Sequence, residues 1–105
     1  MFDMESIQAL YDGNAVKYTR HFRGRIEERG IKKCEISQAL LTGEIIEQHT
    51  DDNPLPSVLI LGYTDDKKPL HIAVSIADDV IWLVTAYHPK PELWETDHKT
   101  RKAVE

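Results

Sequence analysis

Residues 70–87 carry the sequence LHIAVSIADDVIWLVTAY, which predicts two strands and the turn between them. The segments 70–76 and 80–87 are rich in Ile, Val, Leu and aromatic side chains, which favour extended backbone. Asp78 and Asp79 form a two-residue link of the kind that closes tight hairpins. We therefore expect the two segments to pair as antiparallel strands in a β-sheet.

Upstream of this hairpin, the chain changes from helical to strand-like patterning after Gly43. Apolar residues recur at helical spacing before that point and gather in short runs after it. Helices are predicted over residues 3–12, 19–29 and 33–41, and further strands over residues 44–49 and 57–63. The order predicts an α+β fold, with two to three N-terminal helices packed on one face of an antiparallel sheet of about four strands.

Composition favours one domain. The chain has 105 residues, of which 41% are hydrophobic and 30% charged, as in ordinary globular proteins. We expect a single domain over residues 1–105, with a core over about 3–95 and a frayed tail over 96–105. The short apolar runs exclude a membrane-spanning helix, the acidic N-terminus excludes a signal peptide, and Cys34 has no second cysteine to pair with. These features predict a cytoplasmic protein.

Charge is distributed unevenly along the chain. The formal net charge is −5, yet residues 17–33 hold seven basic and two acidic side chains, a net charge of +5. An acidic protein can still present one basic surface to an anion such as a phosphate backbone. The alternative is a solvated helix face whose partners are the chain's own carboxylates.

The predicted helix over residues 19–29 breaks its own amphipathic pattern. At 100° per residue, His21, Arg25 and Arg29 stand along one line beside the apolar stripe of Phe22 and Ile26. Charged groups are rarely buried without partners. Either each arginine pairs with an acid, such as Glu28, Glu44 or Glu47, or the arginines line a groove and hold an anionic ligand.

The two strands of the hairpin supply a second group of candidates. Alternation places His71 on one face of its strand, and Tyr87 on the face shared by Ile81, Leu83 and Thr85. The hairpin brings the start of one strand near the end of the other, so His71 and Tyr87 are expected to lie close together. A histidine near arginines and a tyrosine can perform acid–base chemistry on a phosphodiester. The alternative is a hydrogen-bonded pair at a sheet edge.

Sequence signals for a cofactor are lacking. The five histidines are scattered, with no pair at zinc spacing, and there is no glycine-rich phosphate loop. We therefore expect no metal and no other cofactor.

The chain also resembles the family catalogued as domain of unknown function 4258. The resemblance follows the family's order over about residues 18–95. It rests on the stretches TRHFRGRIEERGI (19–31), ALLTGEIIE (39–47), PS (56–57), LG (61–62), PLHI (69–72), TAYHP (85–89) and LW (93–94). The family-like pattern H-x-x-x-R-x-x-E-R-G-I falls on His21, Arg25, Glu28, Arg29, Gly30 and Ile31, and the later pieces fall on Pro69, Leu70, His71, Thr85 and Tyr87. The resemblance implies a fold similar to small toxins of the RelE and BrnT type, whose characterised members cleave RNA and are neutralised by a partner antitoxin.

Three functional hypotheses follow. The first is a metal-independent endoribonuclease in which Arg25 and Arg29 stabilise phosphate charge, His21 or His71 acts as acid or base, and Tyr87 positions the RNA. The second is a non-catalytic binding or regulatory module in which the arginine cluster is structural, with an antitoxin-like protein or a second copy of the chain as partner. The third is a site for a small anionic metabolite in the same groove.

Overall fold

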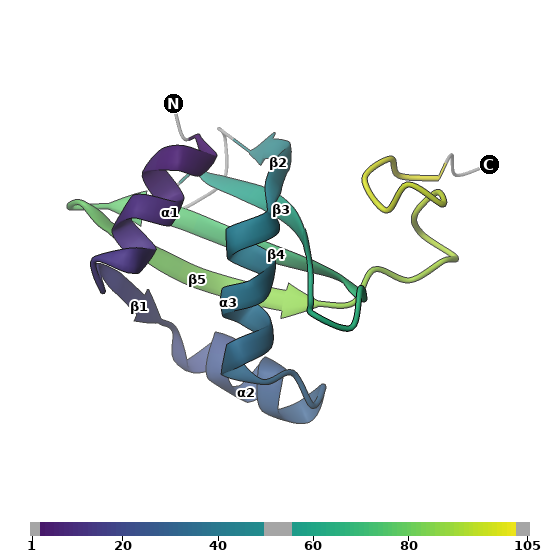
Figure 1. Ribbon diagram of the computed structural model, residues 1–105, viewed down its shortest axis with the longest axis horizontal. Coiled ribbons are helices and arrows are strands. Elements are labelled where there is room, and N and C mark those ends of the chain that lie inside the picture. Colours follow the sequence, from purple (N-terminus) through teal and green to yellow (C-terminus); the bar gives the residue numbers. More distant parts are fainter. Residues whose placement is uncertain (1–2, 50–55, 103–105) are drawn as a thin grey trace.

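The computed structural model describes residues 3–49 and 56–102, and within them it has the predicted α+β architecture. The helices are α1 (Met4–Asp12), α2 (Arg20–Glu28) and α3 (Lys33–Thr42), and the strands are β1 (Val16–Tyr18), β2 (Glu44–His49), β3 (Ser57–Tyr63), β4 (Pro69–Ala77) and β5 (Val80–Tyr87). The sheet order is β1-β5-β4-β3-β2. All three helices lie on one face of this sheet (Figure 1). None of the described helices is long and apolar enough to cross a membrane.

Local sequence explains where the helices begin and end. The side chains of Asp3 and Thr19 accept hydrogen bonds from the backbone N–H groups of Ser6 (2.8 Å) and Phe22 (3.0 Å), which caps α1 and α2. Gly30 follows α2 with φ +65°, a left-handed conformation that glycine adopts at little cost. The chain can therefore turn sharply from α2 into α3.

The predicted hairpin is present, and Ala77 pairs with Val80 across Asp78 and Asp79. Both aspartates have positive φ, 54° and 60°, as a two-residue turn between twisted strands requires. The sheet differs from the prediction in having a fifth strand, β1, which runs parallel to β5. Three residues are too few for a recognisable alternation, which is why β1 has no clear sequence signal.

The core lies between the helices and one face of the sheet. Ile7, Phe22 and Ile36 from the three helices are at most 1% exposed, and they pack against Ile72 and Leu83 of the central strands. Burying a phenylalanine or isoleucine side chain contributes about 1.5–3 kcal/mol. This apolar layer fixes which face of each strand points away from the helices.

A β-bulge in β5 corrects the predicted strand faces. Ala73 pairs with Thr85 while Val74 pairs with Leu83, so Val84 is an additional residue in β5. The alternation therefore changes phase. Leu83 faces the helices, whereas Thr85 and Tyr87 face the opposite side, not the side of Leu83 as unbroken alternation predicts.

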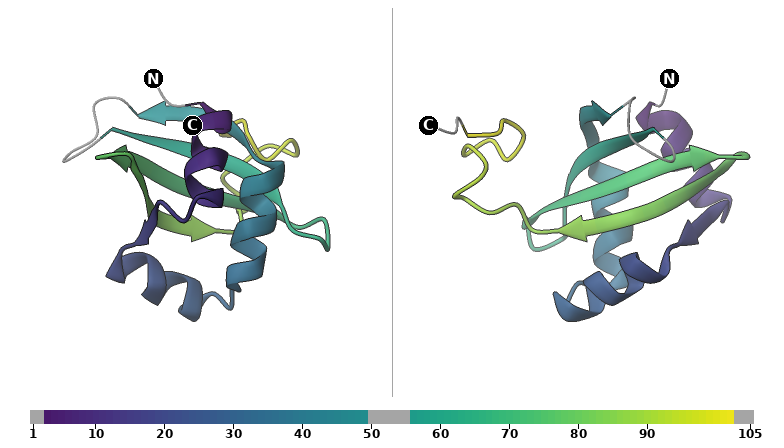
Figure 2. Two further views of the ribbon diagram at one scale, coloured as in Figure 1. Left: turned by 60° about the vertical axis from the view of Figure 1, so that its left-hand side comes forward. Right: turned by 180° about the vertical axis from the view of Figure 1, so that it is seen from behind.

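The second face of the sheet carries no helix among the described residues, and we call it the open face. Figure 2 shows it in front of the helices in the right-hand view. After β5 the chain leaves the end of the sheet and turns back towards β2. Residues 94–102 of this segment, which the sequence predicts to fray from residue 96, contact the sheet through Trp94, His98, Lys99 and Arg101. Residues 103–105 of the predicted tail lie outside the described part of the chain.

Candidate active site on the open face

Strand β2 places a carboxylate and a histidine side by side on the open face. Glu47 pairs with Leu59 and His49 with Ser57, and the two residues are separated by one position, so both point to the same side. His49 Nε2 lies 2.9 Å from Glu47 Oε1. Because a carboxylate only accepts, the ring proton sits on Nε2, and Nδ1 is the nitrogen with a free lone pair.

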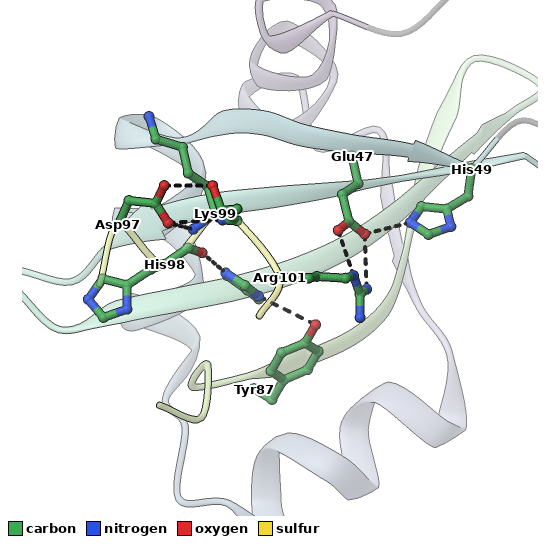
Figure 3. A network of polar contacts seen from close by, with 9 residues as sticks. Glu47, His49, Tyr87, Asp97, His98, Lys99 and Arg101 are labelled. Carbon is green, nitrogen blue, oxygen red and sulfur yellow. Dashed lines mark hydrogen bonds and ion pairs between the residues drawn. The ribbon is translucent and has the colours of Figure 1, made fainter. Parts of the chain in front are cut away.

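An arginine from the C-terminal segment completes this cluster. Arg101 donates from Nε to Glu47 Oε2 (2.7 Å) and from Nη2 to Glu47 Oε1 (3.0 Å), a two-pronged contact between segments far apart in sequence (Figure 3). The hydrogen bonds from Arg101, followed by that from His49, lower the pKa of Glu47 and outweigh its partial burial. Glu47 is therefore ionised and orients both Arg101 and His49.

His71 and Tyr87 lie beside this cluster as a directly opposed pair in β4 and β5. The Tyr87 hydroxyl is 3.4 Å from His71 Nδ1, and His71 Nε2 is 2.6 Å from the carbonyl oxygen of His98. Since a carbonyl only accepts, His71 carries its proton on Nε2 and accepts from Tyr87 at Nδ1. The predicted proximity of His71 and Tyr87 agrees with the structure.

Burial separates the roles open to these two residues. His71 is fully buried, with its ring edge-on to Trp94 at 4.4 Å between centroids, and burial lowers its pKa. Burial also raises the pKa of the half-buried Tyr87 phenol, so that the phenol stays protonated at neutral pH. His71 holds the hydroxyl of Tyr87, while Tyr87 faces the surface.

A shallow hollow of about 150 Å³ joins these groups on the open face. It is lined by His49, Ser57, Val58, Leu59, Ala73, Thr85, Tyr87 and Arg101. A base, a cation and a phenol therefore surround one small space, which suits a phosphate group and the atoms bonded to it.

A second and larger hollow, about 500 Å³, lies at the end of β5, and we call it the end groove. Its walls are Arg29, Tyr87, His88, Lys90, Leu93 and Trp94. Tyr87 borders both spaces. Arg29 donates from Nη1 to the Ala86 carbonyl oxygen at 2.7 Å, which holds its guanidinium at the end of β5.

The five residues singled out by sequence do not form one cluster. His71, Tyr87 and Arg29 come together around the end of β5, whereas His21 and Arg25 line neither hollow. Arg25 lies between the exposed His21 (Nε to Nε2, 3.4 Å) and Glu28 (3.3 Å) on the surface of α2. Exposed ion pairs one helical turn apart contribute only about 0.3–0.5 kcal/mol.

Among the described residues, acids of the chain neutralise only part of the basic stretch over residues 17–33. Of the acids proposed as partners, Glu28 meets Arg25, but Glu44 and Glu47 meet Lys99 and Arg101 from the C-terminal segment. Arg25 therefore pairs with an acid of its own helix, and this exposed pair does not connect the helix to the sheet. Arg29 instead contacts a backbone carbonyl.

Sequence reasoning missed His49 and Arg101 and treated Glu47 only as a partner for the helix arginines. The alternation of Glu47 and His49 in a predicted strand was an available signal for the first pair. Arg101 had none, because its contact depends on how residues 94–102 fold back. Among the described residues, no group of three or more His, Cys, Asp or Glu side chains is placed to hold a metal ion.

Comparison with known proteins identifies a family. The profile of a family described as domain of unknown function (DUF4258) matches residues 18–88, about two thirds of the chain, which include α2 and all of β5. No curated protein and no solved structure matches the chain.

Proposed function

The chain belongs to the family of this domain of unknown function (DUF4258), and from its site we propose that it cleaves RNA without a metal ion. One observation carries the proposal: His49, hydrogen-bonded to Glu47, shares a hollow with Tyr87 and Arg101. Together they supply a general base, a cation and a proton donor around a space that accepts a phosphodiester.

His49 is the base in this mechanism. The 2′-hydroxyl of the substrate gives its proton to Nδ1 of His49, and its oxygen forms a new bond to the neighbouring phosphorus. Glu47 accepts from Nε2 throughout and stabilises the imidazolium that forms, because a carboxylate favours the charged ring. The nucleophile comes from the RNA itself, so no water is consumed in this step.

Arg101 and Tyr87 act on the phosphate. The Glu47 contacts use Nε and Nη2 of Arg101, so Nη1 is directed to a phosphate oxygen as charge develops there. As the bond between phosphorus and the 5′-oxygen breaks, the Tyr87 hydroxyl rotates its proton away from His71 Nδ1 and donates it to that oxygen, which is far more basic than a phenolate. The products are a 2′,3′-cyclic phosphate and a 5′-hydroxyl end.

Expression in a bacterial host tests this activity first. We expect the wild type to degrade cellular RNA and arrest growth, and folded, soluble His49→Gln to do neither. Loss of a general base lowers cleavage by about 10²–10⁴-fold. His21→Gln tests the sequence-based site on α2. RNA breakdown that stops with His21→Gln and persists with His49→Gln would move the active site to the helix.

A chemical test in solution follows. The purified protein is incubated with a random-sequence RNA pool in a metal chelator, and the product ends are analysed. Cyclic phosphate ends that vanish when the RNA is replaced by DNA support the mechanism. A folded wild type that leaves RNA intact both in cells and in solution overturns it and favours the non-catalytic binding module.

A further inference from the structure

The end groove has the chemistry of a nucleotide site. Its walls combine two basic side chains, Arg29 and Lys90, with His88 and with three apolar or aromatic side chains, Tyr87, Leu93 and Trp94. None of the described residues that line it is acidic. Its volume, about 500 Å³, lies within the range of about 300–1,000 Å³ that holds small organic ligands.

One of the two basic side chains, Arg29, is held where a phosphate can reach it. Arg29 uses one N–H for the Ala86 carbonyl, and a guanidinium has five, so the same contact that fixes Arg29 leaves donors for a ligand. His88 lies 2.9 Å through Nδ1 from the Pro69 carbonyl oxygen, which places its proton on Nδ1. Lys90 is exposed and begins a turn. Its backbone carbonyl accepts hydrogen bonds from the N–H groups of Leu93 and Trp94.

The groove also has an apolar wall. Leu93 is 57% exposed and is one of the few exposed large apolar side chains among the described residues. The neighbouring Trp94 is only 3% exposed. Trp94 contacts His71 and Arg101, and the guanidinium carbon of Arg101 lies 4.7 Å from the centroid of the Trp94 ring. A planar base placed against Leu93 and Tyr87 would cover this apolar surface and leave its phosphate towards Arg29 and Lys90.

From these contacts we infer that the end groove binds one nucleotide, base and phosphate together. Because Tyr87 borders both hollows, that nucleotide adjoins the phosphate held by Arg101, and the assignment rests in this respect on the proposed cleavage of RNA. A base can enter the groove only when it is unstacked. The substrate is therefore single-stranded at this position.

Binding of an uncleavable strand tests the site separately from catalysis. The probe is a five-nucleotide 2′-O-methyl RNA, titrated into the wild type, Lys90→Glu and Leu93→Ser at low salt. We expect Lys90→Glu to weaken binding at least tenfold. The slope of the logarithm of the binding constant against the logarithm of the salt concentration should become shallower by about one, the value for one phosphate contact. Lys17→Glu is the matched control, since Lys17 in β1 pairs with the opposite end of β5.

Equal loss with Lys90→Glu and Lys17→Glu overturns the site, because it shows only a general charge effect. Leu93→Ser is expected to weaken binding of adenosine monophosphate but not of inorganic phosphate. If the wild type binds adenosine monophosphate and inorganic phosphate with equal affinity, the groove does not recognise a base and this part of the inference is overturned. A monophosphate that binds when the five-nucleotide strand does not would identify a free nucleotide as the ligand, against the assignment to RNA.

The outcomes also separate the two proposals. If the 2′-O-methyl strand binds in the groove but RNA is never cleaved, the nucleotide site stands and the nuclease fails. If RNA is cleaved equally well by the wild type and by Lys90→Glu, the nuclease stands and the site fails.

Discussion

Gly62 in β3 shows how closely α3 approaches the sheet. A Cβ atom there would overlap the Ala39 carbonyl group and come within 2.6 Å of Ala39 Cα. Backbone cannot move aside as a side chain can, so we expect Gly62→Ala to lower the free energy of unfolding by about 3 kcal/mol or more. Gly24→Ala, on α2 with nothing within 4 Å, should raise it by about 0.5–1 kcal/mol. Urea denaturation of both variants measures the contrast, and equal effects would contradict this packing.

The same scale shows what sequence can predict about the site. Hairpin geometry predicts that His71 and Tyr87 lie close together, because a two-residue turn fixes the register of both strands to within one residue. Their direct pairing depends on the bulge at Val84, since an unbroken hairpin would pair His71 with Ala86. Burial of His71 does not follow, since it depends on Trp94 from beyond the sheet. The position of Arg101 is likewise a tertiary result.

At the scale of elements, the Glu47–Arg101 contact fastens the C-terminal segment to β2. Arg101 is largely exposed, so we expect Glu47→Gln to weaken this docking by only about 1 kcal/mol. Trp94 reports the change, because it is buried when the segment is docked. In a Trp82→Phe background, Glu47→Gln should increase quenching of Trp94 fluorescence by acrylamide.

Glu44→Gln provides the comparison for that experiment. Glu44 accepts from Lys99 at 3.0 Å, but both side chains are about half exposed. We expect little change in Trp94 quenching. If Glu44→Gln exposes Trp94 as much as Glu47→Gln does, the docking is not centred on Arg101.

The elements themselves were largely predictable from sequence, and the exceptions have a common cause. Capping residues such as Thr19 and turn residues such as Asp78 act locally, so they set helix and hairpin bounds without tertiary information. β1 and the bulge at Val84 depend on how β5 pairs with its two neighbours. The residues next to β1 and next to Val84 carry no local signal for the strand or for the bulge.

At the scale of the whole molecule, ionisation of the buried groups limits the pH range of stability. His71 is neutral in the folded protein, with its pKa below the usual 6.5, and burial is the main cause. Between its folded and unfolded pKa the unfolded chain binds more protons, so stability falls as the pH drops below about 6.5. Glu47 also makes stability fall with falling pH, but at lower pH than His71 does. Its pKa is held below 4.5, and its contribution to stability is lost as the pH falls through that lowered value. The raised pKa of Tyr87 has the opposite effect: above about pH 10 the unfolded chain loses this proton first, so stability falls as the pH rises.

We therefore expect the free energy of unfolding to be greatest between about pH 7 and 9 and to fall first on the acid side, with a slope of at most about 1.4 kcal/mol per pH unit from His71. Urea titrations from about pH 7 to 5 measure this slope. His71→Gln keeps a donor for the His98 carbonyl but has no proton to gain, so it should lower stability overall and flatten the slope. His21→Gln, which removes an exposed histidine from α2, is the matched control for the substitution. A slope that survives in His71→Gln would assign it to another group and remove the reason for treating His71 as a permanently neutral support for Tyr87.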